Sequence, residues 1–302
     1  MIEVKNLVKK YGDHTAVDHL SFHVEKGQIY GFLGPNGAGK STTMNIMTGY
    51  IASTSGEVLI DGHNILEEPE AAKKCIGYLP EQPPLYFDMT VAEYLKFAAE
   101  LKKIPKNERE TQIEQVMELT GITAMANRLI KNLSKGYKQR VGLAQAILGY
   151  PEIIILDEPT VGLDPKQIIE IRELIKKLSE EHTIILSSHI LSEVSAVCDY
   201  IMIINHGKLV ASDTTENLMN HSLGSNTLEL TVKGEKQDVK NLLRGVEEIQ
   251  KIEWKAEENE KTVSMVITTE EKTDIREKLF YMMADAKMPI LNMQFTKVSL
   301  ED

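Results

Sequence analysis

The sequence has little cysteine and no long apolar run, and each shortage excludes a class of protein. Its two cysteines, Cys75 and Cys198, stand alone without metal-ligand spacing, so we expect free thiols in a reducing compartment. No apolar stretch approaches the roughly 18–20 residues that cross a bilayer as a helix. Residues 1–5 lack the charged and then apolar pattern of a signal peptide. These absences predict a soluble chain that stays in the cytosol.

Basic residues are also few, with 34 Lys and Arg against 45 Asp and Glu and a net charge of −11. Binding to nucleic acid depends on Lys and Arg that neutralise phosphates, so we expect no nucleic-acid partner. Hydrophobic residues, by contrast, make up 42% of the 302 positions, which is ample for a buried core. The length predicts two domains, or one large domain with an appendage.

A phosphate-binding pattern, G-x-x-x-x-G-K-[ST], occupies residues 34–42, between an apolar run at 29–33 and an expected helix at about 40–48. Its glycines let backbone N–H groups close around a polyphosphate, and the helix N-terminus adds donors and a positive dipole end. Lys40 is expected to reach the β- and γ-phosphates, and Ser41 to offer its hydroxyl to Mg²⁺. The alternative is a glycine-rich turn without a ligand. The candidate ATP-binding residues are Gly34, Pro35, Asn36, Gly37, Ala38, Gly39, Lys40, Ser41 and Thr42.

Two carboxylates, Asp157 and Glu158, follow the short apolar run 153–156, which is typical of a strand buried on both faces of a parallel sheet. Because unpaired buried charge is costly, the pair suggests a function: Asp157 holds Mg²⁺ through its water shell, and Glu158 orients an attacking water. The alternative is a solvated strand end. His189 follows the expected strand 183–186, at the edge where ligands bind in such sheets.

The remaining pattern predicts an α/β fold with a P-loop nucleotide-binding core built on a mixed sheet. To this core we expect an N-terminal antiparallel β subdomain and a helical insert at about 90–150 to be added. Together these parts are predicted to form one domain at 1–220. In the insert, Val91, Leu95, Ala98 and Leu101 share one helix face, and Ser134 can cap a later helix. Tyr11, just upstream of the loop, could stack on a base or be an ordinary turn residue.

Residues 227–302 follow a linker at about 220–226 and show a β-α-β-β-α-β order, which predicts a small α+β, ferredoxin-like domain. This tail contains no cluster of catalytic type. Its interpretation is either a regulatory, dimer-stabilising accessory domain or a passive cap.

Together these stretches resemble the ATP-binding subunits of ABC transporters over about residues 1–220. The resemblance matches Tyr11 to the adenine-stacking aromatic, 34–42 to the Walker A loop and 153–158 to the Walker B strand with its catalytic glutamate. It matches Gln82 to the glutamine that senses Mg²⁺ and the membrane partner, and His189 to the switch histidine. It implies that two subunits close head to tail, and that the residues contributed in trans are Ser134 and Gly136 of the signature segment and Asp164 of the D-loop.

The resemblance implies that the chain energises an integral-membrane exporter, as a homodimer or with a sister ATPase, on the inner face of the cell membrane. Lys135 and Tyr137 in the signature segment and Val161 in the D-loop depart from the usual pattern; we expect Lys135 to face solvent. The version Leu133–Arg140 is similar to a bacterial exporter branch labelled for drug, antibiotic-peptide, sodium or gliding functions. A soluble ATPase acting on the ribosome, a DNA-maintenance ATPase and an importer are the alternatives. Relatives usually continue beyond a stretch like 298–302, so we expect the native chain to be longer.

Overall fold

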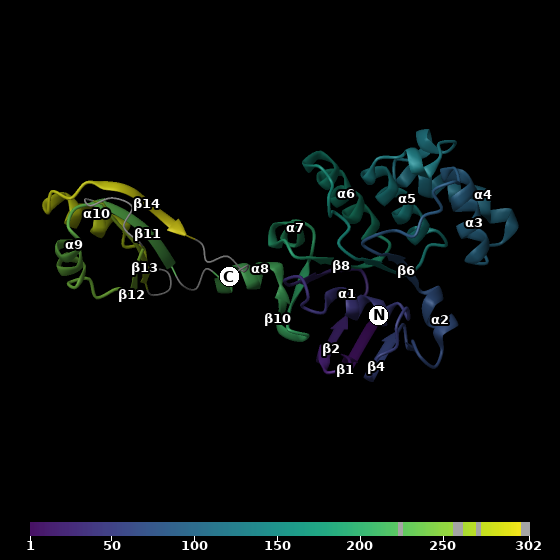
Figure 1. Cartoon of the computed structure of the whole chain (residues 1–302), viewed down its shortest axis with the longest axis horizontal. Helices are drawn as coiled ribbons and strands as arrows, with labels where there is room; N and C mark the ends of the chain where they lie inside the picture. The colour runs from purple at the N-terminus through teal and green to yellow at the C-terminus, as the bar shows by residue number, and fades with distance from the viewer. Residues whose placement is uncertain (223–225, 256–261, 270–272, 297–302) are drawn as a thin grey trace. The chain divides into compact units, whose positions relative to one another are not determined.

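The computed structural model describes all residues except 223–225, 256–261, 270–272 and 297–302, and it divides the chain into two compact units, Met1–Thr215 and Glu216–Asp302 (Figure 1). Helix α8 (Thr215–Ser222) begins where the first unit ends. The predicted linker therefore begins as helix, and its last residues before β11 lie outside the described part of the chain.

The first unit contains two sheets. The N-terminal antiparallel sheet has the order β2-β1-β4-β5, formed by β1 (Ile2–Tyr11), β2 (His14–Val24), β4 (Ser55–Ile60) and β5 (His63–Asn64). The central sheet has the order β10-β9-β3-β8-β7-β6 and is parallel except for β10. Its strands are β3 (Ile29–Leu33), β6 (Ile76–Leu79), β7 (Ile153–Leu156), β8 (Thr183–Ser188), β9 (Tyr200–Asn205) and β10 (Lys208–Thr214). The predicted mixed sheet and antiparallel subdomain are confirmed.

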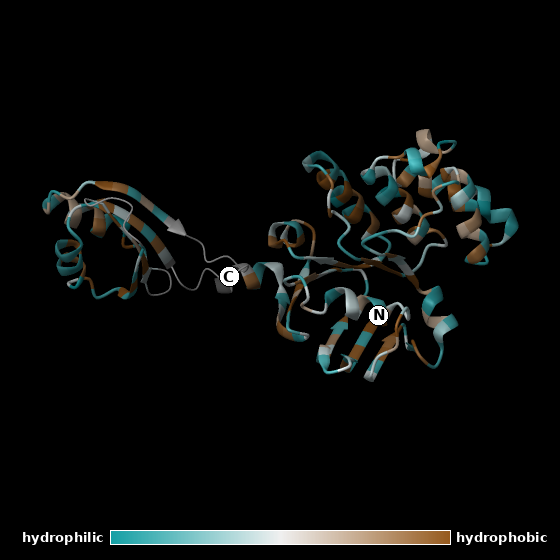
Figure 2. Ribbon diagram, in the orientation of Figure 1, coloured by the Kyte–Doolittle hydropathy of each residue, from teal (hydrophilic) through white to brown (hydrophobic). Residues whose placement is uncertain are grey.

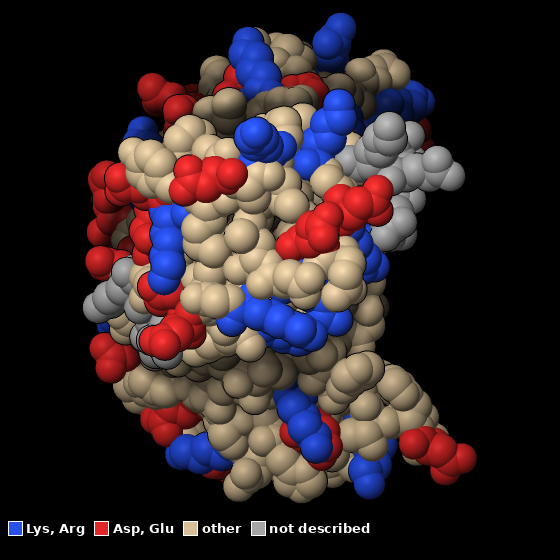
Figure 3. All heavy atoms as spheres, turned by 90° about the vertical axis from the view of Figure 1, so that its left-hand side faces the viewer, with Lys and Arg blue, Asp and Glu red and all other residues tan. Residues whose placement is uncertain are grey.

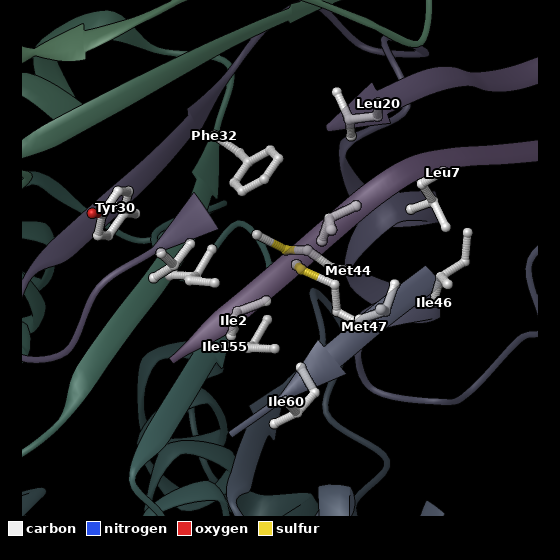
Figure 4. Close-up of a cluster of buried hydrophobic side chains, with 14 of the residues drawn as sticks. Ile2, Leu7, Leu20, Tyr30, Phe32, Met44, Ile46, Met47, Ile60 and Ile155 are labelled. Atoms are coloured by element: carbon white, nitrogen blue, oxygen red, sulfur yellow. The ribbon is translucent and has the colours of Figure 1, made fainter. Parts of the chain in front are cut away.

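Helix α1 (Lys40–Met47) lies between the two sheets and closes the main core. Met44 and Met47 of α1 are fully buried, and Figure 4 shows them among Ile2 and Ile60 of the N-terminal sheet and Ile155 of the central sheet. Each such side chain contributes about 1.5–3 kcal/mol on burial, so the position of α1 is firmly fixed. Because α1 starts at the end of the phosphate loop, the core also fixes that loop. Figure 2 shows the same concentration of hydrophobic residues along the central strands.

The helical insert is confirmed as α3 (Val91–Leu101), α4 (Lys106–Leu119) and α5 (Lys135–Ile147), with short 3₁₀ turns at Thr123–Met125 and Ile130–Asn132. Thr90 begins α3 with a capping box, and Ser134 caps α5 as predicted. All four residues predicted to share a face lie in α3; Val91, Leu95 and Ala98 are buried, whereas Leu101, the last residue of the helix, is 66% exposed.

Three further helices complete this unit: α2 (Pro69–Lys74), α6 (Pro165–Leu178) and α7 (Leu191–Ser195). Strand β6 begins at Ile76, directly after Cys75, which is the C-cap residue of α2. Tyr11 is the last residue of β1. Both cysteines carry free thiols.

The second unit has the predicted element order, with β11 (Asn226–Lys233), α9 (Lys236–Leu243), β12 (Ile249–Trp254), β13 (Thr262–Thr269), α10 (Arg276–Asp285) and β14 (Ile290–Thr296). Its antiparallel sheet has the order β12-β13-β11-β14, and α9 and α10 supply buried residues to its core. Figure 3 shows acidic and basic side chains interspersed over the face of the molecule that it presents.

Candidate nucleotide-binding site

The phosphate loop connects β3 to α1 and passes through a space that only glycine fits. A Cβ on Gly34 would lie 2.1 Å from the carbonyl oxygen of Ile204, and one on Gly39 would lie 2.5 Å from that of Ala16. Gly39 also has a φ of +104°, a conformation that side chains with a Cβ rarely adopt. The Gly207 N–H donates to the Ala38 carbonyl at 2.9 Å, so the turn between β9 and β10 holds the loop from behind. Its backbone is therefore held by strands distant in sequence.

A cavity of about 380 Å³ opens in front of this loop. No side chain caps the first turn of α1, so that helix N-terminus is available for an anion. The cavity brings together many of the predicted residues from four separate segments. Its lining is Tyr11, His14, Ala16, Asn36, Gly37, Ala38, Gly39, Lys40, Ser41, Thr42, Glu81, Glu158, Val161 and His189.

Lys40 is the buried cation of the site, with 5% of its surface exposed. Its Nζ donates to the carbonyl oxygens of Gly34 at 2.7 Å and Pro35 at 3.3 Å. It also lies 3.5 Å from Oε1 of Glu158, whose side chain is similarly buried. The two opposite charges thus compensate each other.

Glu158 occupies a strained position directly beyond β7. Its φ of +48° is unusual for a residue with a side chain, and such strain concentrates at functional sites. The Glu158 N–H donates to Oγ of Ser187 at 2.9 Å, which holds this conformation. Its carboxylate oxygens lie 3.2 and 3.1 Å from Nδ1 of His189. The alternative of a solvated strand end is wrong, because Asp157 and Glu158 are only 3% and 6% exposed.

Asp157 is held by two hydroxyl groups. Ser41 Oγ donates to its Oδ1 at 3.1 Å, and Ser187 Oγ donates to the same atom at 2.6 Å. Carboxylate and hydroxyl oxygens are ligands that Mg²⁺ accepts, usually alongside waters and substrate phosphates. In the described part of the chain, no group of three or more His, Cys, Asp or Glu side chains could hold a metal ion by itself. The donor set therefore fits a Mg²⁺ that arrives with phosphates.

Tyr11 and Gln82 line two different cavities of the site. Tyr11 is 51% exposed and borders the loop cavity, with Lys9 Nζ 5.1 Å from its ring centroid. Gln82 is exposed and does not line that cavity. It lines a second cavity of about 600 Å³, which also contains Asp157 and shares Ser41 and Glu81 with the first.

The segments predicted to act in trans lie away from the loop cavity. Ser134 and Asp164 cap α5 and α6 by accepting from the N–H groups of Tyr137 at 3.4 Å and Gln167 at 3.0 Å. A Cβ on Gly136 would lie 2.5 Å from the Gln167 side chain, so the two helix starts are in contact. Lys135 is exposed, as expected, but its ammonium also lies over the D-loop: a Cβ on Gly162 would be 2.1 Å from Lys135 Nζ.

An aromatic group lies beside a third cavity of about 260 Å³, which is lined by Tyr86, Tyr94 and Phe97 and shares Pro84, Lys102 and Gln145 with the second. Tyr86 and Phe87 are 54% and 52% exposed, and the Tyr86 ring contacts those of Tyr94 and Phe97 at centroid distances of 6.2 and 5.4 Å. Tyr94 itself belongs to the hydrophobic core and is only 3% exposed. Its hydroxyl donates to Oε1 of Gln145 at 2.6 Å. Burial raises the pKa of Tyr94 to about 12.

Sequence reasoning assigned no role to several residues at this site. His14 and Glu81 line the loop cavity, while Ser187 donates to Asp157 and Ser188 donates to Glu193 of α7. The polar pair at 187–188, which ends the otherwise apolar strand β8, was a usable signal. Glu193 has no signal in the sequence alone, because its partners come from a different loop.

Comparison with known proteins gives a consistent picture. The family model described as "ABC transporter" matches residues 17–161. The bacitracin transport ATP-binding protein BcrA of Bacillus licheniformis is 43% identical over 212 residues, covering 70% of this chain and 68% of the relative. The lantibiotic transport ATP-binding protein SrtF of Streptococcus pyogenes is 38% identical over 222 residues, covering 72% and 94%.

Solved structures agree. An ATP-binding subunit of an ABC transporter superposes with a TM-score of 0.67 at 30% identity, covering 73% of this chain and 92% of that one. The dimeric cassette MJ0796 bound to ADP and Pi superposes with a TM-score of 0.65 at 27% identity, covering 71% and 99%.

Proposed function

The chain belongs to the ABC transporter family of ATP-binding proteins and is an ATPase; from this premise we propose that it energises an integral-membrane exporter through ATP-driven, head-to-tail dimerisation. The single observation that carries the proposal is the cluster in which the buried Lys40 and Glu158 meet the more exposed His189 at the phosphate loop. Relatives named for bacitracin transport, lantibiotic transport and linearmycin resistance support the direction of export.

The phosphate loop binds the nucleotide in this proposal. Residues 34–42 surround the phosphates with N–H donors, and Lys40 exchanges Glu158 for the β- and γ-phosphates. Tyr11 stacks on the adenine from the margin of the cavity. Ser41, Asp157 and Gln82 hold Mg²⁺, directly or through water. Bound Mg²⁺ supplies neutralisation of the charge on the β- and γ-phosphate oxygens.

Hydrolysis is assigned to Glu158 and His189. Once a phosphate pairs with the Lys40 ammonium, the Glu158 carboxylate is free to accept a hydrogen bond from the attacking water and so to orient it. His189, whose Nδ1 lies 3.1–3.2 Å from that carboxylate, fixes the direction of the carboxylate and meets the γ-phosphate. The left-handed backbone at Glu158 aims the side chain at the cavity.

A second subunit completes each site. Ser134, Gly136 and Asp164 do not line the loop cavity of their own chain, which fits residues that act on a partner. The dimeric cassette among the similar structures supports this arrangement. The second subunit is another copy or a sister ATPase. Residues 227–302 are proposed as an accessory domain that regulates or stabilises this dimer.

The membrane subunit is proposed to dock at the aromatic group of Tyr86 and Phe87, which follows Gln82 in the chain. The exposed Tyr86 ring lines a cavity of about 260 Å³ that shares Pro84 with the larger cavity lined by Gln82, and these adjoining hollows suit a cytoplasmic helix laid into a groove. Among the described residues no helix is long and apolar enough to cross a membrane. The chain would then be peripheral, on the inner face of the membrane, through that subunit.

The first test is of hydrolysis. We expect Glu158→Gln to reduce turnover by about 10²–10⁴-fold, as loss of a general base does, while ATP still binds and holds a dimer. Lys40→Ala is the control that should lose nucleotide binding itself. Turnover is measured by phosphate release, and binding with a fluorescent ATP analogue. Hydrolysis by Glu158→Gln at the parent's rate would remove Glu158 from the mechanism.

The second test is of the partner. The tagged Glu158→Gln chain is purified with ATP in mild detergent from membranes of its own host. A stoichiometric polytopic membrane protein in the eluate supports the exporter, and a partner that also docks to a periplasmic receptor indicates an importer. Recovery of the chain alone, or with ribosomal proteins, would favour the soluble-ATPase alternative.

A further inference from the structure

Glu193 lies in α7 and bonds both the loop that follows β7 and the last residue of β8. Its Oε2 accepts hydrogen bonds from Thr160 Oγ1 at 2.6 Å and from Ser188 Oγ at 3.0 Å. Thr160 is two residues after Glu158, and Ser188 is the residue before His189. One carboxylate oxygen therefore joins the segment that carries Glu158 to the segment that carries His189.

Ser187 already links the start of the first segment to β8 by accepting from the Glu158 N–H and donating to Asp157, and Glu193 adds a second link further along both segments. Strands β7 and β8 are paired only as far as Leu156 and Leu186, so the ladder ends before either functional residue. Beyond it, Ser188 Oγ also accepts from the Ile190 N–H at 3.1 Å, which leaves its own hydrogen to be donated to Glu193. Both bonds to Glu193 are charge-assisted, the stronger kind of hydrogen bond.

Helix α7 gives Glu193 a rigid base. The next residue, Val194, is fully buried against β3, and a Cβ on Gly31 would lie 2.1 Å from Val194 Cγ1. Gly31 belongs to the strand that leads into the phosphate loop. A small cavity beside these groups is lined by Thr160, Glu193 and Arg172, whose buried Nε has no hydrogen-bond partner among the described residues. The helix that carries Glu193 therefore packs on β3, the same strand that positions the phosphate loop.

We propose that Glu193 is a positioning residue for ATP hydrolysis, which holds the Glu158 carboxylate within hydrogen-bonding distance of His189 by accepting from Thr160 and Ser188. The inference rests on the roles proposed above for Glu158 and His189. Glu193 is absent from the lining of the loop cavity, so it acts on the reaction through those residues and leaves nucleotide binding untouched.

The test compares steady-state kcat and KM for Mg-ATP in the full-length chain. We expect Glu193→Ala to lower kcat by about tenfold to a hundredfold, the worth of a hydrogen bond to a charged group, with KM changed less than about twofold. Glu193→Gln keeps an acceptor oxygen at the same place and should recover most of kcat. Thr160→Val removes one of the two bonds and should give an intermediate kcat, which also serves if Glu193→Ala folds poorly.

Ser195→Ala is the matched control, because Ser195 lies in the same helix and its hydroxyl has no partner among the described residues. It should keep the parent's kcat. A parental kcat in Glu193→Ala, an equal loss in Glu193→Gln, or a rise in KM as large as the fall in kcat would each overturn the proposal. Glu158→Gln distinguishes failure of this proposal from failure of the proposed role of Glu158. If Glu158→Gln is inactive while Glu193→Ala is active, only the role of Glu193 is refuted.

Discussion

The pairing of Lys40 with Glu158 predicts a strong energetic coupling in the protein without nucleotide. The charges are 3.5 Å apart, and both side chains are more than nine-tenths buried. At an effective dielectric constant of about 20, two such charges attract by about 5 kcal/mol. Lys40→Met removes one partner and leaves the Glu158 carboxylate buried with only His189 to compensate it. We expect this change to cost about 3–5 kcal/mol of unfolding free energy.

Glu158→Gln should cost less, because Lys40 keeps its bonds to two loop carbonyls. In the double variant neither charge is present, so it should be more stable than the sum of the single changes predicts. We expect a coupling energy of about 2–4 kcal/mol, below the full attraction because His189 and the carbonyls compensate each remaining charge.

Urea unfolding followed by far-ultraviolet circular dichroism measures this cycle at pH 7. The chain has one tryptophan, Trp254, in β12 of the second unit, so its fluorescence reports that unit separately and should be unchanged by all three variants. Additivity of the two single changes within about 0.5 kcal/mol would refute the pairing of these charges.

Two further predictions concern stability. Because burial raises the pKa of Tyr94 to about 12, the folded state keeps that proton after the unfolded state begins to lose it near pH 10. The stabilisation is complete below pH 10 and is lost between about pH 10 and 12, and it amounts to about 3 kcal/mol. The difference in unfolding free energy between the parent and Tyr94→Phe, measured in urea, should therefore shrink across that range. A difference that stays constant would contradict this prediction. Gly39→Ala should prevent nucleotide binding and destabilise far more than Gly37→Ala, since a Cβ meets the Ala16 carbonyl at 2.5 Å in the first case and nothing within 4 Å in the second. Equal thermal midpoints for the two variants would contradict the tight passage of the loop.

Much of the fold could be predicted because its signals are local. The apolar run 153–156 marked a buried parallel strand, and the polar pair directly after it marked the position of Asp157 and Glu158. The phosphate loop followed from its glycines and the helix after it. Ser134 was recognised as a cap because capping depends on the next three residues.

What the sequence could not predict depends on partners far along the chain. Leu101 fits the apolar spacing of α3, yet it is exposed at the end of that helix, which its spacing did not indicate. Glu193 is an ordinary surface-type residue until Thr160 folds against it. The proximity of Lys40 to Glu158 joins two motifs that sequence reasoning treated separately. Such contacts are set by sheet order, which periodicity does not determine.

The path of the phosphate loop also bears on the order of folding. Gly39 must pass the Ala16 carbonyl, and Ala38 accepts from the Gly207 N–H, so this loop closes on segments from both ends of the first unit. Contacts of such sequence separation form slowly, and larger chains acquire them late. During synthesis, residues 34–42 are made early, but the hydrogen bond from Gly207 to Ala38 cannot form until residue 207 has emerged and folded. Nucleotide binding by a nascent or refolding chain would therefore report completion of the whole unit, and a chain truncated before β9 should fail to bind despite carrying every residue of the loop.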